Sequence, residues 1–343
     1  MNRPRSAPPT PARMTTLDHR LCTAPMMDWS DRHCRYFFRQ LSTRAVVYTE
    51  MVTCGALLHG DIGRHLRFDP AEHPVALQLG GSDPAQLAHC ARLGEQYGYN
   101  EINLNCGCPS ERVQHGAFGA CLMAEPLLVA DCVSAMRAAV SIPVTVKHRL
   151  GIDSIEAYDF VQHFVAVVAA AGCETFFVHA RNAILKGLSP KDNREVPPLK
   201  YDYVYRLKND FPGLRIVVNG GVDTLEAIES QLARVDGIML GRAAYHDPYL
   251  LAQADARLFD ATLRSRRAIV HDMFDYASAQ VAGGTPLRAI ARHMLGLYHG
   301  QANARTWRRM LSDASLLAAN RPGLLLDATQ AAEQGATILA AVA

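Results

Sequence analysis

The chain has 343 residues, of which 49% are hydrophobic and 20% charged, and its 35 basic residues nearly balance its 33 acidic ones. It is long enough to bury a full core, and its balanced charge excludes binding of a polyanion through overall charge, so that such a partner needs a local basic patch. Nine cysteines without paired spacing favour a reducing compartment, and we expect the cytoplasm. No apolar run predicts a membrane span, and residues 1–16, rich in proline and arginine, predict a disordered tail without a secretory signal.

Eight short apolar or β-branched runs begin at residue 21 and predict strands: LCTAPM, VVYTEM, VALQLG, EINLNC, VTVKHRL, TFFVHA, RIVVNGG and GIMLGR. Segments with helical periodicity separate them, for example residues 84–97, 126–140, 154–171 and 224–232. Asp223 and Glu226 predict a capping box at the start of the last of these. Eight strand and helix repeats predict a (β/α)₈ TIM barrel over residues 17–253, with a doubly wound open sheet as the weaker alternative.

Residues suited to binding and catalysis gather where the predicted strands end. In a (β/α)₈ barrel the chemistry lies at the carboxyl ends of the strands, so this placement favours a single site there. The set comprises Pro25, Met26, Met27, Gln78, Asn105, Cys108, Lys147, Arg149, His179, Arg181, Asn219, Gly220, Gly221, Gly241 and Arg242.

The segment NLNCGCPSERVQHGAFGACLM, residues 103–123, places Cys108 just past the fourth strand, where Gly107 and Pro109 end the strand pattern. A strand-end loop holds reactive groups in position, so Cys108 is predicted to be a proton donor, with a buried structural thiol as the alternative. Cys106 and Cys108 are too close for the usual zinc pair and no second pair follows, so we expect no metal. Cys106 should face away from its strand neighbours and pack as a small hydrophobe.

The strand-end glycines and cations predict a phosphorylated ligand. Gly220, Gly221 and Gly241 leave backbone N–H groups available to a phosphate, and Arg242 adds positive charge. Lys147 would stabilise an electron-rich ring or a developing anion, and Gln78 and His179 would supply hydrogen bonds, which together indicate flavin mononucleotide. No G-x-G-x-x-G segment follows a strand, so a nicotinamide donor would bind transiently.

Beyond about residue 255 the strand signal ends, and residues 254–343 predict an all-helical domain rich in alanine, leucine and arginine. Between Pro286 and Leu311 lie five arginines and no acidic residue. This segment is the predicted local basic patch, with an ordinary solvated helix face as the alternative.

The motifs of the chain resemble those of the tRNA-dihydrouridine synthases, and most closely their A subfamily, which acts on uridines 20 and 20a of the D-loop. The resemblance spans nearly the whole chain. It rests on APMMDWSDRHCRYFFRQLS, on NLNCGCPSERVQHGAFGACLM, on VKHRLGID and on HARNAILKGLSPKDNREVPPLKYDYV. Cys106 departs from it, because a small aliphatic residue such as valine is usual at that position.

The resemblance implies that Cys108 is the general acid, that Asn105 orients the base, and that NADPH reduces the flavin. It implies that tRNA contacts Lys191 and Arg194 after the sixth strand and Arg305 and Arg308 in the helical domain. It implies a cofactor site for flavin mononucleotide made of Pro25, Met26, Met27, Gln78, Lys147, His179, Asn219, Gly220, Gly221, Gly241 and Arg242. We expect a monomer without a membrane partner.

Two other functions stay open. One is a barrel oxidoreductase that uses flavin mononucleotide to act on a free pyrimidine or a 2-hydroxy acid, which would not need the arginine-rich domain. The other is an RNA-binding protein without catalytic activity. A yellow colour after purification would count against the second of these.

Overall fold

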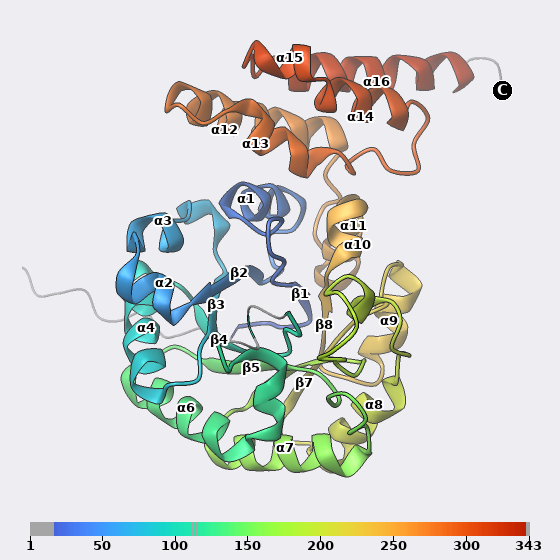
Figure 1. Cartoon of the computed structure of the whole chain (residues 1–343). Helices are drawn as coiled ribbons and strands as arrows, with labels where there is room; N and C mark the ends of the chain where they lie inside the picture. The colour runs from blue at the N-terminus through green and yellow to red at the C-terminus, as the bar shows by residue number, and fades with distance from the viewer. Residues whose placement is uncertain (1–16, 111–112, 114–115, 341–343) are drawn as a thin grey trace, which may run out of the picture.

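The structure is a computed structural model that describes residues 17–110, 113 and 116–340 (Figure 1). The tail that we expect to be disordered, residues 1–16, lies outside the described residues. None of the helices in the described ranges is long and apolar enough to cross a bilayer.

Eight parallel strands form one sheet in the order β1-β8-β7-β6-β5-β4-β3-β2. The sheet closes where Cys22 pairs with Val46, the residue before β2, and Thr23 N donates to Val46 O at 3.0 Å. The predicted (β/α)₈ barrel is therefore confirmed. The strands are β1 Leu21–Thr23, β2 Val47–Thr53, β3 Val75–Gly80, β4 Glu101–Cys106, β5 Val144–His148, β6 Thr175–His179, β7 Arg215–Asn219 and β8 Gly237–Leu240.

Helices connect successive strands and cover the outside of the barrel (Figure 1). Most begin at an Asp, Thr or Pro that the sequence supplies at the cap or first turn, as at Asp83 and Pro84 of α4. These helices are α1 Arg32–Leu41, α2 Cys54–His59, α3 Ile62–Leu66, α4 Pro84–Tyr97, α6 Pro126–Ala139, α7 Tyr158–Ala170, α8 Tyr201–Asp210, α9 Leu225–Leu232, α10 Arg242–His246 and α11 Tyr249–Phe259, with short 3₁₀ turns η1 Pro70–Glu72, η2 Gly119–Ala124 and η3 Asp192–Arg194.

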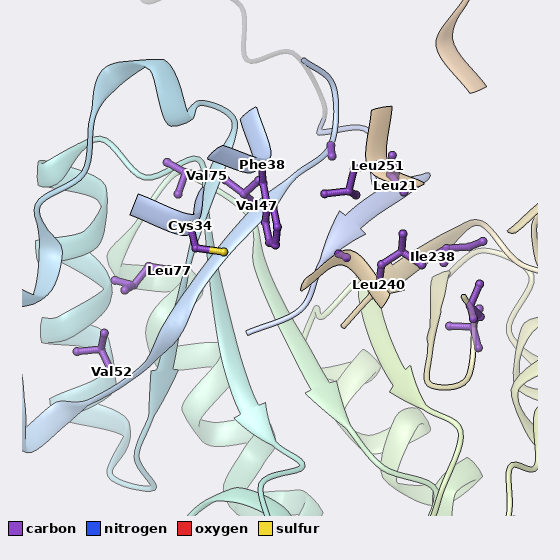
Figure 2. Packing of buried hydrophobic residues seen from close by; sticks show 14 of the residues in the cluster. Leu21, Cys34, Phe38, Val47, Val52, Val75, Leu77, Ile238, Leu240 and Leu251 are labelled. Carbon is purple, nitrogen blue, oxygen red and sulfur yellow. The ribbon is translucent and has the colours of Figure 1, made fainter. Parts of the chain in front are cut away.

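The main hydrophobic core lies between the strands and this outer layer of helices. Alternate residues of each strand face it, such as Ile102, Leu104 and Cys106 of β4, all fully buried. Figure 2 shows part of this layer, with Leu21, Ile238 and Leu240 from β1 and β8, Val47, Val52, Val75 and Leu77 from β2 and β3, Cys34 and Phe38 from α1, and Leu251 from α11.

The other face of each strand points into the barrel. A second apolar cluster fills it, formed by Cys22, Ala24, Val46, Tyr48, Ala76, Phe177, Val217 and Met239. Polar side chains from β3, β4 and β5 share this interior, among them Gln78, Asn103 and Thr145, each at most 1% exposed. The interior is thus packed at its amino-terminal end and polar along one side.

Two local predictions were wrong. The N-cap of α9 is Thr224, whose hydroxyl accepts the N–H of Ala227 at 3.1 Å, and so Asp223 and Glu226 form no capping box. Helix α7 starts four residues later than the predicted 154, because residues 152–155 form a turn in which Ile152 pairs with Ile155 and Ala183. In both places a hydrogen bond that the periodicity does not encode fixes the start of the helix.

The carboxyl-terminal part of the chain is helical, as predicted. It comprises α12 Arg266–Ala282, α13 Leu287–Ala291, η4 Arg292–Met294, α14 Ala304–Ser312, α15 Ala314–Ala318 and α16 Leu324–Ala340. Helices α12 and α13 pack on α1, while α14 and α15 lie with α16 farther from the barrel (Figure 1). Helix α11 runs across the domain boundary expected between residues 253 and 254.

Candidate active site

A cavity of about 1500 Å³ opens at the carboxyl ends of the strands and extends to Ala289 and His299 of the helical domain. It brings together most of the residues that the sequence marks for the site. Those that line it are Pro25, Met26, Met27, Gln78, Asn105, Cys108, Lys147, Arg149, His179, Arg194, Asn219, Gly220, Gly221, Gly241 and Arg242. Arg181, Lys191, Arg305 and Arg308 do not line it.

Cys108 lies half-buried on the loop that follows β4. Asn105 holds this loop, because its Oδ1 accepts the backbone N–H groups of Gly107 at 3.1 Å and Cys108 at 2.9 Å. On the other side Ala120 N donates to Cys108 O at 2.9 Å, and the left-handed φ of 78° at Gly119 allows this close return. The thiol is therefore carried on a loop that is anchored at both ends.

Cys106 and Cys108 have opposite environments, although they are two residues apart. Cys106 is fully buried among the helices outside the barrel, and burial raises the pKa of its thiol well above the usual value. Cys108 instead lines the cavity. The prediction that Cys106 packs as a hydrophobe is confirmed, and Cys108 is the thiol that a ligand can reach.

Arg149, to which we assigned no role, braces the Cys108 loop. It is 3% exposed, and its guanidinium donates to the carbonyls of Gly107, Asn182 and Asn193 at distances from 2.8 to 3.2 Å. It thereby joins the loops that follow β4 and β6. The sequence signal that could have identified Arg149 is the motif VKHRLGID, in which this arginine follows the inward-facing Lys147 by two residues and so lies on the same face of the strand.

Three basic groups lie together at the bottom of the cavity. Burial, followed by the charge of Arg149, lowers the pKa of Lys147 to about 7, and burial lowers the pKa of Arg149 to about 10. Burial and the same two cations hold the pKa of His179 well below its usual value. Lys147 Nζ donates to Asn219 Oδ1 at 3.0 Å. Neither Lys147 nor Arg149 pairs with a carboxylate in the described part of the chain, so this end of the cavity favours an anionic or electron-rich ligand.

A glycine pair follows β7 at the edge of the cavity. Gly220 and Gly221 have left-handed φ values of 106° and 72°, and an added Cβ would come within 2.7 Å of His179 Cδ2 and 2.5 Å of Leu199 Cδ1. Their backbone N–H groups have no acceptor among the residues that the structure describes, whereas Gly220 O accepts from Tyr201. Two backbone donors without an acceptor, on the edge of a cavity lined by Lys147 and Arg149, suit a phosphate.

Gly241 and Arg242 differ from this glycine pair. Gly241 has a negative φ, and only Ala24 Cβ, at 3.7 Å, would meet an added Cβ, so there is room for a side chain at this position. Arg242 is an exposed side chain that is ion-paired with Glu195, and its Nη2 donates to Arg194 O at 3.1 Å. A phosphate here would share the guanidinium with Glu195.

Basic side chains stand on opposite rims of the cavity. Arg64 and Arg67 come from α3 and the residue after it, which follow β2, whereas Arg194 and Arg242 follow β6 and β8. Arg64 and Arg67 are exposed and form no ion pair within the described ranges. No sequence pattern marked these two, because they lie in a connection without a motif. Trp29 stacks on Tyr245 at 4.3 Å between the rim and the helical domain.

The donor set fits a flavin mononucleotide. The cavity has the volume for an isoalloxazine ring together with a second ring, Lys147 and Arg149 line it, and the glycine pair offers donors for a phosphate. Within the described ranges, no three His, Cys, Asp or Glu side chains are grouped so as to hold a metal ion.

The chain is similar to proteins of known class. A family model described as dihydrouridine synthase matches residues 22–334. Proteins named tRNA-dihydrouridine(20/20a) synthase are 56% identical in Synechocystis sp. (91% of this chain and 94% of that protein), 57% in Pseudomonas syringae pv. tomato (94% and 97%) and 54% in Vibrio cholerae (91% and 95%). Among solved structures, a 2-naphthoyl-CoA reductase in complex with 2-naphthoyl-CoA matches with a TM-score of 0.52 and 13% identity over 68% of this chain and 49% of that one, which supports the fold alone.

Proposed function

The chain belongs to the dihydrouridine synthase family of flavin-dependent oxidoreductases, and we propose that it reduces the C5–C6 double bond of uridines 20 and 20a in the D-loop of tRNA. One observation carries this proposal. A reachable thiol, Cys108, lines the same cavity as Lys147 and the buried Arg149, neither of which has a carboxylate partner in the described part of the chain. Relatives named for this reaction cover more than nine-tenths of the chain.

The cofactor of the proposal is flavin mononucleotide. Lys147 would lie beside the ring system, His179 and the N–H groups of Gly220 and Gly221 would bind the phosphate, and Met26 and Met27 would supply apolar contact. Gln78 retains one amide proton beyond its bond to Asn103 and can donate it to the ring edge. When bound and reduced, the flavin supplies the hydride.

Cys108 supplies the matching proton. When a hydride adds to C6 of the uracil, the π electrons move onto C5 and toward the C4 carbonyl, and the S–H proton of Cys108 transfers to C5. Both atoms of hydrogen are thus accounted for, and solvent returns a proton to the thiolate. Arg149, whose pKa a Cys108 thiolate would raise, stands close enough to stabilise that anion.

Transfer RNA is the substrate that the surface favours. A uridine must leave its loop stack to enter the cavity, which costs a few kcal/mol, and contacts to phosphates elsewhere can offset that cost. Exposed arginines stand on both rims of the cavity, and α14 carries Arg305 and Arg308 on its exposed side. Lys191, also exposed, precedes η3 beside Arg194.

NADPH is the proposed reductant, binding transiently because no strand is followed by a dinucleotide-binding glycine motif. The proposal places the protein in the cytoplasm, where tRNA is modified, and as a monomer. Gel filtration with light scattering would test the second of these.

As a test, the visible spectrum of the purified protein is recorded, its flavin is reduced with NADPH in the absence of oxygen, and an acceptor is then added. Transfer RNA from a strain that lacks this protein should re-oxidise the flavin, and free uracil should not. Mapping of the product should find dihydrouridine at positions 20 and 20a. A colourless protein that takes up no flavin contradicts the proposal, and faster re-oxidation by free uracil would assign the chain to small-molecule oxidoreductases.

A further inference from the structure

A continuous chain of hydrogen bonds crosses the inside of the barrel from the Cys108 loop to Glu101, the first residue of β4. Every side chain in it is at most 8% exposed. The links are Cys108 N to Asn105 Oδ1 at 2.9 Å, Asn105 Nδ2 to Gln78 Oε1 at 2.8 Å, Gln78 Nε2 to Asn103 Oδ1 at 2.7 Å, Asn103 Nδ2 to Thr145 Oγ1 at 2.8 Å, and Thr145 Oγ1 to Glu101 Oε1 at 2.7 Å.

The two ends of the chain fix its direction. At one end the backbone N–H of Cys108 can only donate, and at the other end Glu101 Oε1 accepts from the hydroxyl groups of Thr145 and Tyr48. Thr145 has one hydroxyl proton, so when it donates to Glu101 it must accept from Asn103. The carbonyl oxygen of Asn103 then faces Gln78, and that of Gln78 faces Asn105. Each amide therefore has only one orientation in which every link is satisfied.

Glu101 is itself fixed by its neighbours at the amino-terminal end of the barrel. Its Oε1 also accepts the hydroxyl of Tyr48 at 2.6 Å, and its Oε2 lies 2.5 Å from His19 Nε2. Burial, followed by the charge of Glu101, raises the pKa of Tyr48 well above its usual value, so the phenol stays protonated and donates. Arg215 Nη1 lies 3.2 Å from the other nitrogen of His19.

We propose that Glu101 is a positioning residue for Cys108, which acts through Thr145, Asn103 and Gln78 to keep the carbonyl oxygen of Asn105 aimed at the Cys108 loop. If the amide of Asn105 turned over, its NH₂ group would meet the N–H groups of Gly107 and Cys108, and two half-buried donors would lose their acceptor. A carboxylate at the far end of the barrel thus holds the loop that carries the thiol. The expected effect on catalysis rests on the proposed function, whereas the expected effect on the Cys108 loop does not.

Two hydroxyl groups that donate to the same oxygen give a matched pair of variants. Thr145→Val removes the hydroxyl that lies on the route to Cys108, whereas Tyr48→Phe removes the one that lies off it. Hydrogen exchange of the flavin-free protein is measured at the amides of Gly107 and Cys108 and, for reference, at Met239 in β8. We expect Thr145→Val to speed exchange at Gly107 and Cys108 by roughly three- to tenfold relative to Met239, while Tyr48→Phe and Thr145→Ser leave this ratio unchanged.

The kinetic readout uses the flavin-loaded enzyme. With tRNA as substrate, Thr145→Val should lower kcat by roughly ten- to a hundredfold with little change in KM, because the Cys108 loop is displaced and the arginines on the rims of the cavity are not. Equal exchange ratios in Thr145→Val and Tyr48→Phe would overturn the proposal, whatever reaction the enzyme catalyses. If valine is not accommodated, Thr145→Ala, which also lacks the hydroxyl, gives the same comparison.

Discussion

The amino-terminal end of the barrel and its carboxyl-terminal mouth differ in whether the chain provides partners for the charged groups there. At the amino-terminal end Glu101 receives hydrogen bonds from Tyr48 and Thr145 and contacts His19, so the chain compensates the carboxylate itself. At the mouth a half-buried Lys147 lies beside the buried Arg149, and removal from water lowers the pKa of each. The chain itself therefore supplies the partners of the buried charge at the amino-terminal end, whereas the cations at the mouth are left for an anionic ligand to compensate.

The physical reason is the cost of desolvation. A buried charge without a counter-charge destabilises the folded state, and it persists where an anionic ligand compensates it on binding. Removal of a charge should therefore have opposite effects on stability at the two ends. Changes at the mouth should, in addition, alter function.

The largest effect is expected at the mouth. Cys108→Ala should lower the rate of dihydrouridine formation by roughly 10² to 10⁴, the usual contribution of a general acid, with flavin and tRNA still bound. Single turnover of the pre-reduced protein with tRNA measures this rate. Cys121→Ala, at a half-buried thiol outside the cavity, is the control and should leave the rate unchanged. Equal rates for Cys108→Ala and the parent protein would identify another proton donor.

At the amino-terminal end, Glu101→Leu should lower the free energy of unfolding by roughly 3–5 kcal/mol, because buried donors lose their acceptor. Urea unfolding of the flavin-free protein measures this change. As the control, Glu229→Gln removes an exposed ion pair with Arg257 and should leave the midpoint unchanged. A Glu101→Leu protein as stable as the parent would show that the carboxylate is not needed at this end.

Lys147→Met should raise the free energy of unfolding, which is the opposite of the effect expected for Glu101→Leu. The folded-state pKa of Lys147, about 7, lies below the ordinary 10.5, so the unfolded chain binds more protons between these values and stability rises with pH across that window. Below pH 7 Lys147 is protonated in both the folded and the unfolded state, so the full cost of burying its charge destabilises the folded protein. After allowance for partial exposure, the variant should gain roughly 1–3 kcal/mol at pH 6 and less at pH 10.

Unfolding of the flavin-free Lys147→Met protein in urea at both pH values measures that gain. Arg149, His179 and Cys108 also face this lysine, so Asn219→Ala, which removes the acceptor of Lys147 and a donor to Met239 O but leaves the charge, serves as the comparison. The same gain for Lys147→Met at pH 6 and pH 10 would show that packing, and not charge, is responsible.

The smallest effects are expected at the exposed arginines. The double variant Arg305→Ala with Arg308→Ala should weaken tRNA binding and reduce the slope of log K against log salt by roughly 0.7–0.9 for each lost phosphate contact. Arg64→Ala with Arg67→Ala tests the opposite rim in the same way. Filter binding across a range of salt measures the slopes, and NADPH should still reduce the flavin. An unchanged slope would place that pair outside the tRNA interface.

Strand periodicity was sufficient to predict the barrel. The eight runs recovered all eight strands, β3 and β4 with their observed bounds, because a parallel barrel strand is a short buried run between turn residues. The same rule placed Cys108, Lys147 and Asn219 at one mouth, since parallel strands end together. The start of α7 and the cap of α9 were wrong, because a turn pairing and a competing cap residue decided them.

The sequence by itself determined the order of elements, the inward or outward face of each strand residue, and the set of side chains at the mouth, because these follow from periods of two and 3.6 residues along the chain. Only the tertiary structure decided which buried groups meet. Arg149, the ion pair of Arg242 with Glu195 and the link from Glu101 to Cys108 each join separate strands or loops. The arginines of α3 reach the cavity because the barrel places α3 at its edge. Closure of the barrel sets those distances, and no local pattern encodes them.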